Sequence, residues 1–232
     1  ILRSWDSSIL LLFSSMEYLP INYMRILSWN CRGAGSKWTI SYLREIWHKH
    51  KPDFLFLSET KQDQEFMQDF QAHFGYDNLV TVDPIGRSGG LALYYNNEFE
   101  VKISYTSNRM IDVEAVALGR RVYITFVYGD PVQELREQVW ERLTRFGLAR
   151  SEPWFVIGDL NEITGNHEKD GGAIRSPDSF VPFNTMIRNG GLLEFPARGN
   201  KLSWQGRRGK GVGAVMVRCR LDRALAKEES HT

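Results

Sequence analysis

Short apolar runs alternate with polar breaks along most of the chain, and the runs follow two patterns. Some are continuously apolar and rich in β-branched and aromatic residues, which is typical of strands buried on both faces. Others repeat apolar residues every three or four positions, which predicts helices with one buried face. The regular pattern begins at Met24, so we expect residues 1–23 to be an N-terminal extension.

The pattern predicts strands joined both by helices and by tight turns. The predicted strands span residues 24–29, 54–59, 78–82, 90–95, 99–106, 111–118, 121–128, 154–157, 201–205 and 217–225. The predicted helices span residues 39–50, 62–74, 131–146 and 179–188. This mixture implies an α/β fold in which two β-sheets pack together and helices cover the outside, a four-layer sandwich.

The third helix carries the clearest signals for its two ends. Asp130 can cap it, Pro131 suits the first helical position and Gln133 can complete a capping box. Val132 begins an apolar stripe, and Gly147 can end the helix.

Composition narrows the classes of protein that remain. An apolar fraction of 42% in 232 residues is enough for a large core. Two cysteines cannot form a disulfide framework, which favours a reducing compartment, the nucleus or cytoplasm. Since no apolar run approaches the length of a membrane span, we expect no membrane partner. No obligate protein partner is evident.

Polar side chains that bear oxygen follow the predicted strands at or beside their ends. They are Asn30, Glu59, Tyr128, Asp159, Asn161 and Asp222. Strand ends of an α/β sheet are where functional sites assemble. If the backbone stays extended from Asp159 to Asn161, their side chains point the same way. The set suits Mg²⁺ or Mn²⁺ better than zinc.

Each of these residues also has an ordinary structural explanation. Gly-Asp is a common way to leave a strand, and Asn30 can be a turn residue. Glu59 can cap a helix, Tyr128 can be a half-buried aromatic residue, and Asp222 can pair with a neighbouring arginine.

Five motifs, in order, resemble the endonuclease/exonuclease/phosphatase superfamily, which includes apurinic endonucleases and is DNase I-like. They are Ser28-Trp29-Asn30, Leu57-Ser58-Glu59-Thr60, Val127-Tyr128-Gly129, Gly158-Asp159-Leu160-Asn161 and Arg220-Leu221-Asp222-Arg223. Residues 29–33, 88–93, 158–163 and 168–172 further resemble the endonuclease domain of plant LINE-type non-LTR retrotransposons. The resemblance extends over residues 24–226.

The resemblance implies a role for each residue. Glu59 would be the principal metal ligand, and Asn30 would bind the metal or the scissile phosphate. Asp159 would orient or deprotonate the attacking water, while Asn161 would hold a phosphate oxygen. Tyr128 would donate a hydrogen bond to the phosphoryl group. Asp222 would normally orient a catalytic histidine.

The chain departs from the family pattern after Asp222. The family closes with a Ser-Asp-His motif on a last strand, and we expect the domain at 24–226 to lack both. Residues 227–232 read as a charged tail, where His231 is expected to be exposed rather than catalytic. The resemblance therefore implies an impaired nuclease with an exposed edge beside residues 217–225.

Basic residues cluster shortly before Asp222. The glycine-rich segment 205–213 contains Arg207, Arg208 and Lys210, and it is expected to be a flexible loop. A solvated loop is one explanation, and contact with the phosphate backbone of double-stranded DNA is the other.

Three functions remain open. The first is a metal-dependent endonuclease that nicks double-stranded DNA. The second is a phosphatase or phosphodiesterase that acts on a lipid or a small phosphoester. The third is a nucleic-acid-binding remnant with weak or no turnover.

Overall fold

The computed structural model describes residues 8–12, 24–86, 88–117, 119–196, 200–209 and 214–227. Most of the expected N-terminal extension lies outside these ranges, as do Lys210, His231 and almost all of the expected tail. Residues 8–12 of that extension form a strand, β1 (Ser8–Leu12), antiparallel to β2 (Arg25–Asn30).

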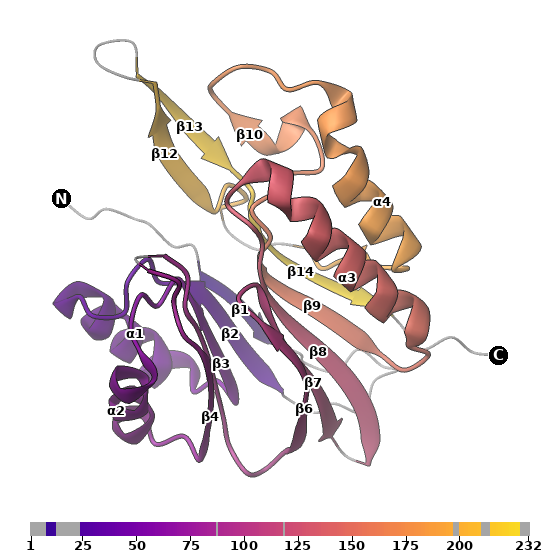
Figure 1. The fold of residues 1–232 in the computed structure, drawn as a ribbon. Coiled ribbons are helices and arrows are strands. Elements are labelled where there is room, and N and C mark those ends of the chain that lie inside the picture. Colours follow the sequence, from indigo (N-terminus) through magenta and orange to yellow (C-terminus); the bar gives the residue numbers. More distant parts are fainter. Residues whose placement is uncertain are drawn as a thin grey trace.

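The chain forms two large sheets that face each other (Figure 1). The first has five strands in the order β1-β2-β3-β5-β4, which adds β3 (Phe54–Ser58), β4 (Asn78–Val82) and β5 (Leu91–Tyr95). The second has six strands in the order β11-β14-β9-β8-β7-β6. Its strands are β6 (Glu100–Ser107), β7 (Met110–Ala117), β8 (Arg120–Tyr128), β9 (Trp154–Asp159), β11 (Leu193–Glu194) and β14 (Asp222–Lys227).

Helices cover the outer face of each sheet (Figure 1). The first sheet carries α1 (Lys37–His50) and α2 (Gln64–Phe74), and the second carries α3 (Arg136–Ala149) and α4 (Val181–Asn189). Three 3₁₀ turns lie in the second half, η1 (Gln133–Leu135), η2 (Asn166–Glu168) and η3 (Pro177–Phe180). None of the described helices is long and apolar enough to cross a membrane.

The strand sequences explain the four layers, because alternate residues are buried on opposite faces. In β3, Phe54 and Phe56 pack between the two sheets, while Leu55 and Leu57 pack under α1 and α2. In β9, Ile157 lies between the sheets and Val156 lies under α3 and α4. The predicted four-layer α/β sandwich is confirmed.

The third helix begins later than predicted. The chain passes through η1 before α3 starts at Arg136. Asp130 accepts a hydrogen bond from the Val132 amide (2.8 Å), but its carboxylate also forms an ion pair with Arg109 (2.7 Å). This long-range pair holds Asp130 outside the helix and leaves Val132 exposed.

Gly147 does not end the third helix but lies inside α3. A Cβ there would come within 2.8 Å of both the Gly190 Cα and the Trp154 ring. This glycine therefore permits close packing of α3 against its neighbours, a different use from the predicted helix stop.

The C-terminal strands also differ from the prediction. The strand predicted at 201–205 is β12 (Trp204–Arg208), and the one predicted at 217–225 is divided into β13 (Val215–Cys219) and β14. The division occurs at residues 220–221, where the Ser203 hydroxyl accepts hydrogen bonds from the amides of Leu221 (3.1 Å) and Asp222 (3.0 Å). The chain changes sheets at this point.

A third, small sheet projects from the sandwich (Figure 1). It contains β12, β13 and the short β10 (Lys169–Asp170). The edge expected to be open beside residues 217–225 is partly covered, because β14 lies between β9 and β11 in the six-stranded sheet. The Phe195 amide extends this pairing to the Ala224 carbonyl (3.0 Å).

Candidate active site

Four of the predicted site residues come from strand ends of both sheets and are joined by hydrogen bonds. Asn30 Nδ2 donates to Glu59 Oε1 (3.1 Å) and to Asp159 Oδ2 (2.9 Å). The Tyr128 hydroxyl donates to the same Glu59 oxygen (2.8 Å). Two parallel strand pairs, β2–β3 and β8–β9, explain this convergence, because their carboxyl ends lie at the same edge.

Asp222 faces Asp159 directly. The two residues are Cα partners where antiparallel β14 begins and β9 ends, and both are buried. Burial raises the pKa of Asp159, and the Asn30 hydrogen bond opposes that rise. Burial and then the Asp159 charge raise the pKa of Asp222 well above its usual range. Opposed carboxylates on adjacent strands repel each other when both are ionised.

Charged and polar neighbours act on the pKa of Asp222. In the described part of the chain they are Asp159, Ser203, Arg32 and Arg223, and no histidine is among them. Arg32 lowers the pKa of both facing carboxyl groups.

Asn161 is near the site, but its backbone is not extended as the sequence argument assumed. Its φ is 53°, and its amide donates to Asp159 Oδ1 (2.8 Å), which closes a turn. Its side-chain Nδ2 donates to the Gly129 carbonyl (2.8 Å). The turn interpretation therefore describes the backbone of this segment, while a role for Asn161 in the site stays a prediction. One amide hydrogen remains for another acceptor.

Left-handed backbone is concentrated around the strand ends. Four non-glycine residues here have positive φ, namely Arg32, Glu59, Lys61 and Asn161. Such conformations persist only where surrounding contacts hold them, and they are frequent at functional sites. Gly129 serves the same crowded region, since a Cβ there would lie 2.1 Å from the Leu160 carbonyl oxygen.

The charges at the site are mainly negative. Asp159 faces Asp222, and the Asn30 amide links Asp159 to Glu59, while Lys61 lies 3.6 Å from Glu59 Oε2. Burial and the adjacent Glu59 carboxylate raise the pKa of the Tyr128 hydroxyl, which therefore stays protonated as a donor at neutral pH.

The donor set fits a hard divalent cation. Carboxylate and amide oxygens are suitable ligands for Mg²⁺ or Mn²⁺. Within the described ranges, no group of three His, Cys, Asp or Glu residues forms a metal cluster, so a site here would need the Asn30 amide beside Glu59. In the structure the Asn30 NH₂ group lies between Glu59 and Asp159, where it offsets part of their negative charge.

The predicted DNA-binding arginines lie on a strand, not in a loop. Arg207 and Arg208 end β12, which pairs with β13 along its whole length, and this pairing corrects the expectation of a flexible segment there. The Arg208 guanidinium lies 5.3 Å from the centre of the Trp204 ring. Arg32 approaches the same ring at 5.9 Å, which connects the hairpin to the strand end at Asn30.

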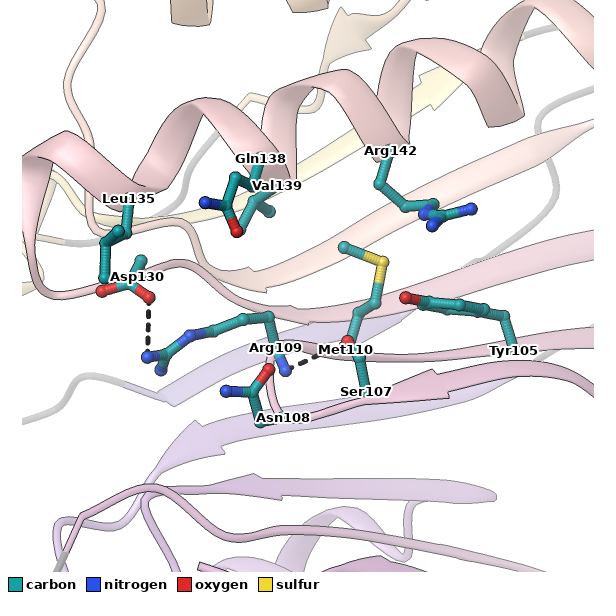
Figure 2. Close-up of a pocket in the computed structure, with 10 residues that line it drawn as sticks. All are labelled: Tyr105, Ser107, Asn108, Arg109, Met110, Asp130, Leu135, Gln138, Val139 and Arg142. Atoms are coloured by element: carbon teal, nitrogen blue, oxygen red, sulfur yellow. Dashed lines mark hydrogen bonds and ion pairs between the residues drawn. The ribbon is translucent and has the colours of Figure 1, made fainter. Parts of the chain in front are cut away.

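Sequence reasoning missed Arg109, which contacts the site from the β6–β7 turn. Its guanidinium lies 5.4 Å from the centre of the Tyr128 ring and pairs with Asp130. Arg109 lines a pocket of about 320 Å³, together with Gln138 and Arg142. Figure 2 shows this pocket between the β6–β7 turn and α3. The signal in the sequence was weak, because a single arginine in a hairpin turn indicates no particular contact.

Solved structures share this fold. The endonuclease domain of TRAS1, a telomere-specific non-LTR retrotransposon, has a TM-score of 0.59 at 15% identity and covers 88% of this chain and 84% of its own. The AP endonuclease LMAP from Leishmania major has a TM-score of 0.66 at 17% identity and covers 97% and 86%. The 3' phosphatase NExo from Neisseria, bound to a product DNA hairpin, has a TM-score of 0.61 at 18% identity and covers 88% and 86%.

Sequence comparison gives the family directly. No curated protein matches the sequence. The Endonuclease/Exonuclease/phosphatase family matches residues 27–232, which include every strand end described above. The chain belongs to the endonuclease/exonuclease/phosphatase family.

Proposed function

We propose that this protein is a metal-dependent phosphodiesterase that nicks double-stranded DNA, as a retrotransposon-derived endonuclease of the plant LINE type would. One observation carries the proposal: a single amide, Asn30 Nδ2, connects Glu59 and Asp159, while Tyr128 donates to Glu59. Carboxylates, an amide and a phenol that converge from the strand ends of both sheets suit phosphoryl chemistry.

Glu59 and Asn30 are the residues that would hold Mg²⁺ or Mn²⁺. A bound divalent ion would supply charge stabilisation to the phosphoryl oxygens. A cation would offset the negative charge of Glu59 and of the Asp159–Asp222 pair, which repels an anionic substrate. Asn30 would have to turn its amide oxygen toward the ion, which replaces the bonds from Nδ2 to Glu59 and Asp159 and the bond that Oδ1 accepts from the Arg32 amide (3.2 Å).

The remaining residues act on the substrate. Asp159 accepts the proton of an attacking water or orients it, and Asn161 donates its free amide hydrogen to a phosphate oxygen. Tyr128 stays protonated and can move its hydrogen bond from Glu59 to the phosphoryl group. Asp222 faces Asp159 across the start of β14, where it can orient the group that receives or returns a proton.

The test is conversion of supercoiled plasmid to open circle with Mg²⁺ and, in parallel, with EDTA. Nicking that requires the divalent ion and exceeds hydrolysis of a small phosphoester supports the proposal. Preference for the small ester would favour the phosphatase. Tight DNA binding without turnover in either arm would favour a binding remnant.

The β12–β13 hairpin offers a prediction about DNA affinity. Arg207 and Arg208 are successive residues of a strand, so they point to opposite faces of the hairpin. Replacing both by alanine should weaken binding and reduce the salt slope of log K by about 1 for each lost phosphate contact. The measurement is fluorescence anisotropy of duplex DNA across a salt series.

The matched control for the hairpin variant is the double variant Lys102→Ala with Arg145→Ala. Both residues are basic and exposed, and they lie outside the hairpin, on β6 and on α3. It removes the same formal charge. Equal salt slopes for the hairpin variant and the wild type would mean that the two arginines make no phosphate contacts and that this segment is an ordinary solvated surface.

A further inference from the structure

Glu162 is a buried carboxylate directly after Asn161, and two arginines surround it. Arg136 Nη1 donates to Glu162 Oε2 (2.9 Å), and Arg175 Nη1 donates to Glu162 Oε1 (2.6 Å). Arg175 Nη2 also reaches Oε2 (3.2 Å), and the Ile163 amide donates to Oε1 (2.9 Å). Both oxygens thus accept charge-assisted bonds in fixed directions, the arrangement in which an ion pair specifies geometry best.

Arg136 extends this cluster to the segment that follows Tyr128. Its Nε donates to the Asp130 carbonyl (2.8 Å), and its Nη2 donates to the Pro131 carbonyl (3.2 Å). The guanidinium therefore fixes a segment without regular structure by holding its backbone oxygens. Glu162 in turn fixes the guanidinium, and Arg136 keeps only 13% of its side chain exposed.

The same segment is also bonded to the turn at the end of β9. The Gly129 amide donates to the Asp159 carbonyl (2.7 Å), and Asn161 Nδ2 donates to the Gly129 carbonyl (2.8 Å). Three consecutive residues after Tyr128 are thus tied to residues 159–162, two of them through Arg136. The strand ends that carry Tyr128 and Asp159 are held together beyond the last ladder pair of β8 and β9.

Arg175 anchors the opposite side of the carboxylate. Asn166 accepts from the Arg175 amide (3.0 Å) and donates to its carbonyl (2.8 Å). The guanidinium lies 4.6 Å from the centre of the Phe180 ring. Arg175 is therefore held independently of the site, so it provides a rigid support from which Glu162 can orient Arg136.

We propose that Glu162 is a positioning residue. Through Arg136 and Arg175, it fixes the separation between the Tyr128 hydroxyl and the side-chain amide of Asn161. This inference rests on the proposed phosphodiesterase function. Glu162 does not touch the reacting atoms. Its contribution is to hold Asn161 in its left-handed conformation and the 129–131 segment against it.

The test compares Glu162→Gln and Arg136→Lys with the wild type in steady-state plasmid nicking at saturating Mg²⁺. Glutamine keeps the shape but has one acceptor oxygen for two guanidinium groups. Lysine keeps the charge but lacks the planar fork that reaches the two carbonyls. Each variant should lower kcat by about 10²-fold with KM within about 3-fold of wild type, since small misplacements act on the transition state.

The double variant should be no slower than either single variant, because the two residues act as one unit. The matched control is Asp112→Asn, which weakens another buried carboxylate–arginine pair, in which Asp112 bonds to Arg150 and Thr125. Rates are compared well below each melting temperature. The proposal is overturned if Glu162→Gln and Arg136→Lys both fold and keep the wild-type kcat. It is also overturned if Asp112→Asn loses as much kcat as they do.

Amide hydrogen exchange of peptides covering residues 129–136 and 159–163 provides a readout that does not need activity. Both peptides should exchange faster in Glu162→Gln and at the wild-type rate in Asp112→Asn. If the wild type does not nick DNA, the proposed function fails. Amide exchange then tests by itself whether Glu162 holds residues 129–131 against residues 159–162. Unchanged exchange in Glu162→Gln rejects that role.

Discussion

Asp159→Asn is expected to slow plasmid nicking by about 10²–10⁴-fold, the usual contribution of a general acid or base. The side chain keeps its size and can still accept from the Asn161 amide, so the turn at the end of β9 should survive. What is lost is the carboxylate that can accept a proton from water. The measurement is the single-turnover rate at saturating Mg²⁺.

The same variant should gain stability at neutral pH in EDTA, because it removes one of two buried carboxylates that face each other. The wild-type pair has raised pKa values when folded, so the native state binds protons more tightly than the unfolded chain. The free energy of unfolding of the wild type should therefore fall as pH rises above about 3.8, the ordinary pKa of an aspartate. That of Asp159→Asn should fall less steeply.

The control for this variant is Asp69→Asn, an exposed carboxylate on α2. It should change neither the nicking rate nor the pH dependence of the free energy of unfolding, measured by urea denaturation. A variant at Asp159 that is both slower and less stable than wild type would mean that the carboxylate is a structural support and not a strained functional group.

Glu59→Gln is expected to remove most of the stabilisation that Mg²⁺ or Mn²⁺ gives the folded protein. An ion at 100 times its Kd adds about 2.7 kcal/mol to a protein that binds it only when folded. For a chain of this size that corresponds to roughly 5–10 °C in melting temperature. Glutamine preserves an acceptor for Tyr128 but lacks the charge a hard cation requires.

Melting curves with and without Mg²⁺ check this expectation. Glu65→Ala, which removes a carboxylate from the exposed first turn of α2, is the matched control and should keep the wild-type shift. Equal Mg²⁺-induced shifts in the melting temperatures of Glu59→Gln and the wild type would show that Glu59 is not a metal ligand. Any need for Mg²⁺ in the nicking assay would then have to come from other residues.

Local pattern was sufficient to predict the layers and the strand ends. The run from Phe54 to Ser58 is buried at every position in the structure. Its apolar composition was therefore sufficient to predict a central strand. Asn30, Glu59 and Tyr128 could be predicted as neighbours because they follow such runs. In each of these cases the decisive information lies within a few residues of the position.

The errors have a common physical cause, which is contact between residues distant in sequence. The late start of α3 depends on the Asp130 pair with Arg109, and the break before β14 depends on Ser203. The left-handed backbone of Asn161 depends on hydrogen bonds to neighbouring segments. Nothing in the sequence indicated that Glu162 binds Arg136 and Arg175, because neither arginine is near it in sequence.

The division of the strands along the chain has a consequence for synthesis. Residues 24–95 contain β2 to β5 and supply Asn30 and Glu59, whereas residues 100–227 contain β6 to β14 and supply Tyr128, Asp159 and Asp222. A nascent chain that has folded only its first sheet thus holds only part of the candidate site. Under the proposed function, no nicking is expected until the second sheet has been synthesised and has folded against the first.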